Sequence, residues 1–216
     1  MRYTFIFMLL FATIGAKAAP DFENHFGMGV MHLNFELLQE IKLYTDKNDK
    51  VAPAKTITFT VSGKGKSKTA KLETANADNW LKPELLKPEK LLFSMRVLTR
   101  ETGWYQVMVN NSNYTTYWVR KIEGLDFYSW SEELLRSASV VRLTRDTNPL
   151  RKFQNSTIII PWDPKYADCF RPVKILGQWM EVETREVCAD GTTKVKSAWI
   201  QWYDDERLLV DYSLIP

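Results

Sequence analysis

Three short blocks of sequence recur in the same order in the two halves of this 216-residue chain. The first block has an apolar residue, a basic residue and a Leu in succession and ends with Asp. The second has a Gly and a Trp before alternating apolar residues, and the third has a Trp followed by Val or Ile. The paired blocks are 41–46 with 141–146, 96–107 with 174–182, and 117–120 with 198–202. An ordered repeat of this kind predicts two copies of one small domain.

Both halves have the residue pattern of β-strands. The segment 104–109 alternates apolar side chains, Asn and Ser at 110–113 break it, and the chain returns over 115–121, which predicts a hairpin. The second half repeats this arrangement with strands over 180–184 and 192–202, separated by an Asp-Gly turn signal. The repeated unit is therefore expected to be mostly β.

A short helix is predicted between the halves. Ser129 precedes Glu132 by three residues and two leucines follow, which is the capping-box pattern of a helix N-terminus. We therefore expect a helix over 130–136 inside a helical linker over 124–139. The first half also carries an insertion near 52–90, which has no counterpart in the second half. The expected domains are 28–123, which includes that insertion, and 140–216.

The repeated motifs resemble those of the bacterial SH3-like (SH3b) domain, which is a small β-barrel. A strand ending in Leu and Asp, a central Gly-Trp-x-x-Val strand and a closing Trp-Val or Trp-Ile strand carry the resemblance. It covers 140–216 well and 40–122 loosely, and Ala198 stands where the family usually has Gly. The resemblance implies a mainly β fold of two small SH3-like barrels joined by a short helix.

Members of that family bind peptidoglycan peptides or protein ligands, often while attached to cell-wall hydrolases or surface proteins. No attached enzyme is visible in this sequence. The resemblance therefore implies a stand-alone, non-catalytic binding module of the bacterial cell envelope, which recognises peptidoglycan or a protein or peptide ligand. The alternative is a structural or scaffold protein of the envelope with no small ligand, because a fold by itself does not fix a ligand.

The start of the chain has the pattern of a secretory signal. An apolar run over 5–16 follows Arg2 and is too short to span a bilayer as a helix. Small residues at Ala16 and Ala18 predict a signal peptide over 1–18 that is cleaved after Ala18. The alternative is an anchor that is never cut. Cleavage predicts a periplasmic or extracellular protein without a transmembrane anchor.

The net charge bears on the class of partner, and the cysteine content bears on a disulfide. The chain has 29 basic and 26 acidic side chains, a net charge of +3, which disfavours nucleic acid as a partner. Cys169 and Cys188 are its two cysteines, and export to an oxidising compartment predicts a disulfide between them. Such a bond would contribute on the order of 3 kcal/mol of stability. The alternative is a pair of buried free thiols.

Aromatic residues are the candidate ligand-binding side chains. Flat rings contact sugars and peptides with little loss of entropy on ordering, so an exported binding module is expected to use a groove lined by aromatics. The candidates are Trp179, Trp199, Trp202 and Tyr203 in the second half, and Trp104 and Trp118 in the first. The alternative is that these rings fill the core, because Trp is usually highly buried. If Met180 and Val182 face the core, Trp179 faces the other way, into a groove or under a loop.

The basic cluster and the histidines give no strong indication of a binding or catalytic site. The basic cluster 63–71 could bind an anionic polymer, but Gly and Ser within it favour a solvated hairpin tip. His25 and His32, the two histidines, have no second ligand at a metal-binding spacing, and no nucleophile, P-loop or dinucleotide motif occurs. We therefore expect no catalytic residues, no metal and no cofactor.

Overall fold

The computed structural model describes residues 26–163, 165–185, 195–204 and 206–215. Within these ranges the chain forms three antiparallel sheets and one α-helix, so the expectation of a mainly β fold with a short helix is confirmed. The expected signal peptide, 1–18, and His25 lie outside the described residues, and its cleavage stays a prediction.

The first sheet has six strands. Its order is β8 (Thr115–Arg120), β7 (Trp104–Asn110), β6 (Leu92–Glu101), β1 (Gly29–Leu33) and β9 (Leu125–Ser129), and β5 (Leu85–Lys87) also pairs with β6. Strands β6, β7 and β8 form an antiparallel meander. The hairpin predicted from the segments 104–109 and 115–121 is therefore confirmed.

The second sheet has the same arrangement of five strands. Its order is β13 (Ala198–Gln201), β12 (Trp179–Thr184), β11 (Phe170–Leu176), β10 (Ser139–Arg142) and β14 (Val210–Ser213). In both sheets a meander is flanked by an earlier strand, and the last strand pairs with that earlier strand. Both meanders also begin with a strand whose register shifts once, in β6 and in β11.

The common strand order corrects one part of the predicted repeat. The second and third pairs of blocks lie on equivalent strands, but 41–46 and 141–146 do not. The strand that occupies the place of β10 is β1, and its sequence Gly-Val-Met-His-Leu parallels Ser-Val-Val-Arg-Leu at 139–143. The prediction was wrong because a β-branched or aliphatic pattern recurs in many strands, and only the hydrogen-bonded neighbours decide which strands correspond.

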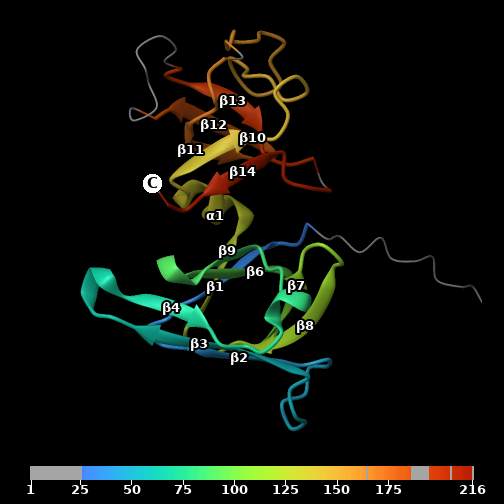
Figure 1. Cartoon of the computed structure of the whole chain (residues 1–216). Coiled ribbons are helices and arrows are strands. Elements are labelled where there is room, and N and C mark those ends of the chain that lie inside the picture. Colours follow the sequence, from blue (N-terminus) through green and yellow to red (C-terminus); the bar gives the residue numbers. More distant parts are fainter. Residues whose placement is uncertain (1–25, 164, 186–194, 205, 216) are drawn as a thin grey trace, which may run out of the picture.

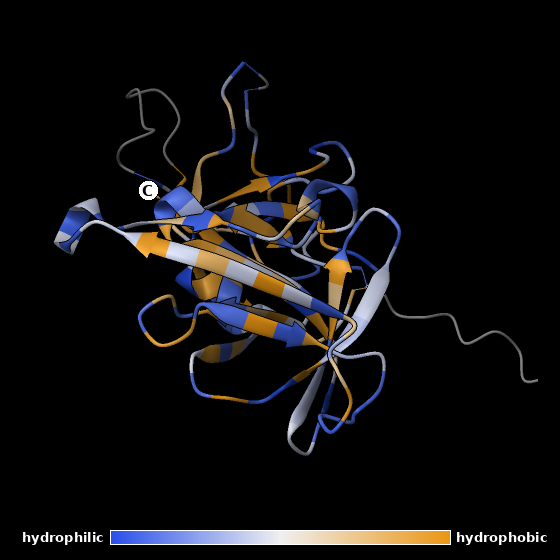
Figure 2. Ribbon diagram, turned by 60° about the horizontal axis from the view of Figure 1, so that its bottom comes forward, coloured by the Kyte–Doolittle hydropathy of each residue, from blue (hydrophilic) through white to orange (hydrophobic). Residues whose placement is uncertain are grey.

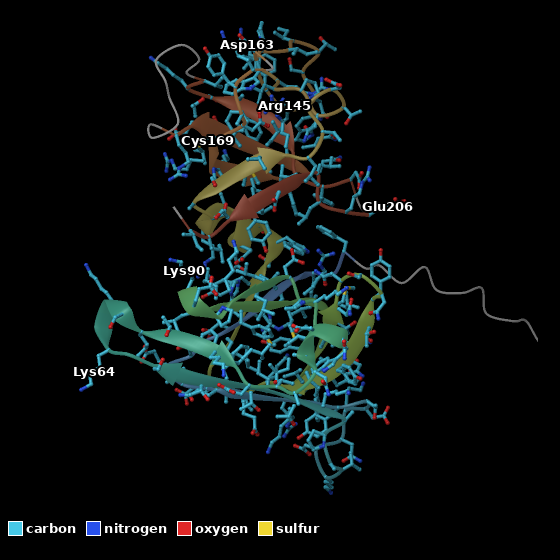
Figure 3. All side chains as sticks on the ribbon, viewed as in Figure 1. Lys64, Lys90, Arg145, Asp163, Cys169 and Glu206 are labelled. Carbon is cyan, nitrogen blue, oxygen red and sulfur yellow. The ribbon has the colours of Figure 1, made fainter. Side chains whose placement is uncertain are left out.

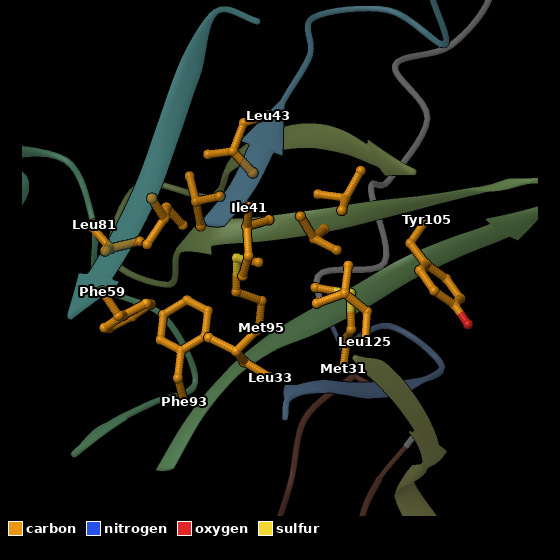
Figure 4. Packing of buried hydrophobic residues seen from close by; sticks show 14 of the residues in the cluster. Met31, Leu33, Ile41, Leu43, Phe59, Leu81, Phe93, Met95, Tyr105 and Leu125 are labelled. Carbon is orange, nitrogen blue, oxygen red and sulfur yellow. The ribbon is translucent and has the colours of Figure 1, made fainter. Parts of the chain in front are cut away.

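The third sheet forms a second layer over the first sheet, and only its last two strands come from the predicted insertion, 52–90. It consists of β2 (Glu40–Leu43), β3 (Lys55–Ser62) and β4 (Thr69–Leu72). Hydrophobic and hydrophilic residues alternate along the ribbon of its long strand, β3 (Figure 2). Ile41, Phe59 and Leu43 meet Met95 and Phe93 of the first sheet in one buried cluster (Figure 4). Short 3-10 turns lie at Gly65–Ser67, Ala77–Asn79 and Pro88–Lys90.

Neither five-strand arrangement closes into a barrel within the described ranges. The edge strands of the first sheet, β8 and β9, do not pair with each other, and neither do β13 and β14 of the second. In the first half the third sheet packs against the first sheet through one buried cluster. The described strands thus form open sheets, in place of the two closed barrels that the resemblance implies.

Helix α1 (Trp130–Arg136) connects the halves (Figure 1). The capping box is present as predicted, since Ser129 Oγ accepts from the Glu132 backbone N–H and the Ser129 N–H donates to the Glu132 carboxylate. The helix is shorter than the predicted helical linker, 124–139, because β9 occupies the start of that segment and pairs with β1.

Strand β1 lies between two cores. Its five residues are all buried, and Met31 and Leu33 point into the core shared with the third sheet. Val30 points to the other side, into a cluster that contains Trp130 and Leu134 of α1 and the inner face of the second sheet. The two halves therefore share one apolar cluster across their junction.

Buried polar pairs lie at matching positions of the two halves. His32 of β1 has Nε2 at 2.9 Å from Oε1 of Glu133 on α1, and Glu133 is fully buried. Arg142 of β10 donates from Nε and Nη2 to the carboxylate of Asp168 at 2.7 and 2.9 Å. In each half, the strand beside the meander thus has one buried polar side chain, and that side chain pairs with a carboxylate from a later segment.

Trp130 is the aromatic centre of the junction, so its truncation should destabilise the whole fold. Its ring stacks on Phe26 at 5.4 Å, and its Nε1 donates to the Phe26 carbonyl at 3.1 Å. We expect Trp130→Ala to lower the free energy of unfolding by about 4 kcal/mol, measured by urea titration. Trp130→Phe keeps the stacking and should cost less. Equal losses for both variants would contradict the packing role of the indole.

The capping box gives a pH-dependent contribution to stability. Hydrogen bonds from the Ser129 side chain and backbone hold the pKa of Glu132 below its ordinary value of 4.5. A lowered pKa in the folded state stabilises the fold above the unfolded pKa, and this contribution is lost as the pH falls through the folded pKa. Urea midpoints of the parent and Glu132→Gln should therefore differ at neutral pH and converge in acid. A pH-independent difference would contradict this.

Candidate functional site

The six predicted aromatic site residues do not form one groove. Trp104, Trp179 and Trp202 are buried, whereas Trp118, Trp199 and Tyr203 are half-buried. They fall into three separate groups, each with its own packing partners.

Trp202 and Tyr203 belong to the junction between the halves. The Trp202 indole donates from Nε1 to the Gly177 carbonyl at 2.7 Å. Phe26 stacks on Tyr203 at 5.5 Å and lies 6.0 Å from the Trp202 ring. These two rings are therefore occupied by internal packing.

Trp179 and Trp199 lie beside the long loop of the second half. Met180 and Val182 point into the core as predicted, and Trp179 is absent from that core cluster. The guanidinium of Arg151 lies 5.7 Å from the centre of the Trp179 ring. The Arg151 backbone also forms a bridge with Trp199. Of the two predicted surroundings for Trp179, packing under a loop is the one observed.

Trp104 and Trp118 have the same kind of cover in the first half. Tyr44 contacts the Trp104 ring edge-on at 5.6 Å, and its backbone bridges Trp118. The guanidinium of Arg120 lies 5.1 Å from the Trp104 ring, and the Lys47 ammonium lies 4.9 Å from the Trp118 ring. In both halves, a residue from the long segment before the meander covers the Trp of its middle strand.

A groove lies where β2 and β8 separate, next to Trp104. Its volume is about 330 Å³, near the lower end of the range of small ligand pockets. Its apolar lining comes from Leu38, Ile41 and Tyr44 on one side and from Val119 and Ile122 on the other. Ile122 is 46% exposed, so apolar surface is open to solvent here. This groove is the candidate functional site.

The charges at the rim of the groove are paired with each other. Arg120 Nε lies 3.0 Å from a carboxylate oxygen of Asp49, and Lys42 Nζ lies 3.6 Å from one of Glu40. All four residues line the groove, with two positive and two negative charges. Such a rim gives little net attraction for an anionic or cationic polymer, and it suits a ligand of low net charge.

Sequence reasoning identified Trp104 beside this groove but not the groove itself. The lining is drawn from two segments, 38–49 and 119–122, that are about seventy residues apart in the chain and meet only because the third sheet lies against the first. Exposed apolar residues such as Ile122 give no sequence signal of their own, since single exposed apolar side chains are common.

Other predicted features are placed as follows. The basic cluster 63–71 spans the turn of the β3–β4 hairpin, with Lys64 at its tip (Figure 3). This position agrees with the prediction that the cluster is a solvated hairpin tip. Cys169 is disulfide-bonded, and Cys188 lies outside the described residues, so the predicted pairing stays a prediction.

The described residues contain neither a candidate metal site nor a candidate membrane-spanning helix. In the described part of the chain, no three His, Cys, Asp or Glu side chains are grouped so that they could hold a metal ion. None of the helices within the described ranges combines the length and the apolar character needed to cross a membrane. In comparisons with known proteins, no family model, no curated protein and no solved structure matches this chain.

The covered tryptophans should matter for stability. Trp179 is 7% exposed, whereas Phe153 of the same half is 52% exposed. We expect Trp179→Ala to lower the free energy of unfolding by about 3 kcal/mol, and the matched control Phe153→Ala to change it by less than about 0.5 kcal/mol. Urea titration measures both. If Trp179→Ala left stability unchanged, the ring would have to be a free surface group.

Proposed function

We propose that this protein is an exported, non-catalytic binding module of the bacterial cell envelope, and that it recognises a protein or peptide ligand. The observation that carries the proposal is the apolar groove between β2 and β8, with its self-neutralised rim. A ligand of mixed, low charge with apolar side chains suits such a groove, and a peptide is the class of ligand that has this chemistry.

The proposed likeness to SH3-like domains supports a binding role. Each half contains a meander flanked by two further strands, and each meander starts its second strand with the Trp of the Gly-Trp motif or its variant. Domains of that family bind peptidoglycan peptides or protein ligands. Under this proposal the contact surface lies in the first half, beside Trp104 and Trp118.

A structural role is the second candidate, because one observation favours it. The apolar cluster at the junction joins Phe26, Val30 and Trp130 to the inner face of the second sheet, and it contains Trp202 as well. A protein whose aromatics hold two halves together could act as a scaffold with no small ligand.

The peptide proposal is tested by selection from a random octapeptide display library. Binding of enriched peptides to the full chain is compared with binding to Ile122→Glu, which places a charge in the groove. Leu176→Glu is the matched control, since Leu176 is 45% exposed and Ile122 is 46% exposed. Neither exposed substitution should change stability by more than about 0.5 kcal/mol.

We expect peptides that bind the parent and Leu176→Glu, with binding to Ile122→Glu weakened by about tenfold or more, because an unpaired carboxylate in an apolar contact is costly. Co-sedimentation of the same proteins with purified sacculi tests whether wall peptides are included. If no peptide is enriched and no variant differs on sacculi, the peptide-binding role is rejected and the scaffold candidate gains.

A further inference from the structure

The pairing between β2 and β8 stops after a single bridge. Tyr44 and Trp118 exchange both backbone hydrogen bonds, at 2.9 and 2.8 Å. Beyond this bridge the described residues show no further ladder between the two strands. The groove opens at this point, between Lys42 and Glu40 on one side and Arg120 and Ile122 on the other.

Beyond the bridge β2 and β8 diverge, and we call the space between their edges the wedge. The direction of the backbone groups that border it follows from the alternation of antiparallel pairing. In such a ladder, every second residue directs its N–H and C=O to the same neighbour. Because Tyr44 faces β8, Lys42 also faces that side, and because Trp118 faces β2, so does Arg120. Residues at the alternate positions face the other way: Gln39 accepts from Phe59 of β3, and Lys121 donates to Gly103, which directly precedes β7.

Two strand edges with outward backbone groups therefore border one apolar groove. In antiparallel register, Lys42 would be the next partner of Arg120 after the Tyr44–Trp118 bridge, but no bridge forms there. Such edges are templates for a further strand. Only a polypeptide carries N–H and C=O groups at the period of these edges, together with a side chain on alternate sides.

We propose that an extended peptide segment enters this wedge and hydrogen-bonds the outward backbone groups of Lys42 and Arg120, as an added β-strand. Every second side chain of the peptide packs on Leu38 and Ile122, the aliphatic lining residues that are not buried, and the others point to solvent. This inference rests on the proposed peptide-binding function and specifies its mode: the ligand is read mainly through its backbone.

The test uses a probe of fixed sequence, acetyl-Lys-Val-Thr-Val-Thr-Val-Lys-amide, which has Val on one face when extended. Its binding to the full chain is followed by NMR, with amide exchange at Lys42 and Arg120 as the readout. The control probe is the same peptide N-methylated at every second residue, which keeps the side chains and removes backbone donors. The peptides selected from the display library are tested in the same way.

The matched protein variants are Lys42→Pro and Lys42→Ala. Proline removes the N–H that faces the wedge, and strands tolerate proline where the N–H is not used in the sheet. Alanine removes the side chain and the charge that pairs with Glu40 but keeps the N–H, so the difference between the two variants isolates the backbone donor. Circular dichroism and urea titration of both variants verify the fold.

We expect saturable binding that slows amide exchange at Lys42 and Arg120. Lys42→Pro should weaken it by about tenfold relative to Lys42→Ala, and N-methylation should weaken it by a similar factor. If library peptides bind and lose affinity in Ile122→Glu, but Lys42→Pro and N-methylation have no effect, the strand inference is overturned and the proposed function stands. The same holds if the Val-containing probe fails where library peptides bind. If no peptide binds at all, both are overturned.

Discussion

The structure depends on the placement of β1 between two apolar cores. In most sheets one face of a strand is buried and the other is solvated, but all five residues of β1 are buried. Met31 and Leu33 pack under the third sheet, while Val30 packs against α1 and the second sheet. Both halves therefore pack against the same strand. Trp130 adds to this contact by stacking on Phe26 and contacting Tyr212 edge-on.

The two halves differ mainly in the long segment that precedes the meander. Both halves bury a Trp at the start of the middle strand of the meander, and both cover it from the preceding long segment. In the second half that segment supplies Arg151, and in the first half it supplies Tyr44 and a complete third sheet. The groove exists only in the first half because it needs a strand from that third sheet, β2, to diverge from β8.

The sequence was informative where the determinants are local. The capping residues Ser129 and Glu132 are three positions apart, and the helix begins where they predict. The hairpin of β7 and β8 follows from alternation and an Asn-rich turn, which are also local signals. The correspondence of β1 with β10 and the groove beside β8 could not be predicted in this way, since both depend on pairings between segments far apart in the chain.

The surroundings of the aromatic residues also depend on contacts between distant segments, which local sequence patterns do not predict. A Trp on the face opposite the core has two possible environments, a groove or a covering loop, and the choice depends on whether a distant segment reaches it. At Trp179 and Trp104, cationic side chains from Arg151 and Arg120 lie against the rings, which uses the faces that a ligand would need. In the binding mode that we propose, the ligand contacts the neighbouring strand edges, where Lys42 and Arg120 have no described strand partner on the groove side and Ile122 is exposed. Trp104 contacts Tyr44 and Arg120, two residues that line the groove, so this tryptophan lies behind the proposed contact surface and is not part of it.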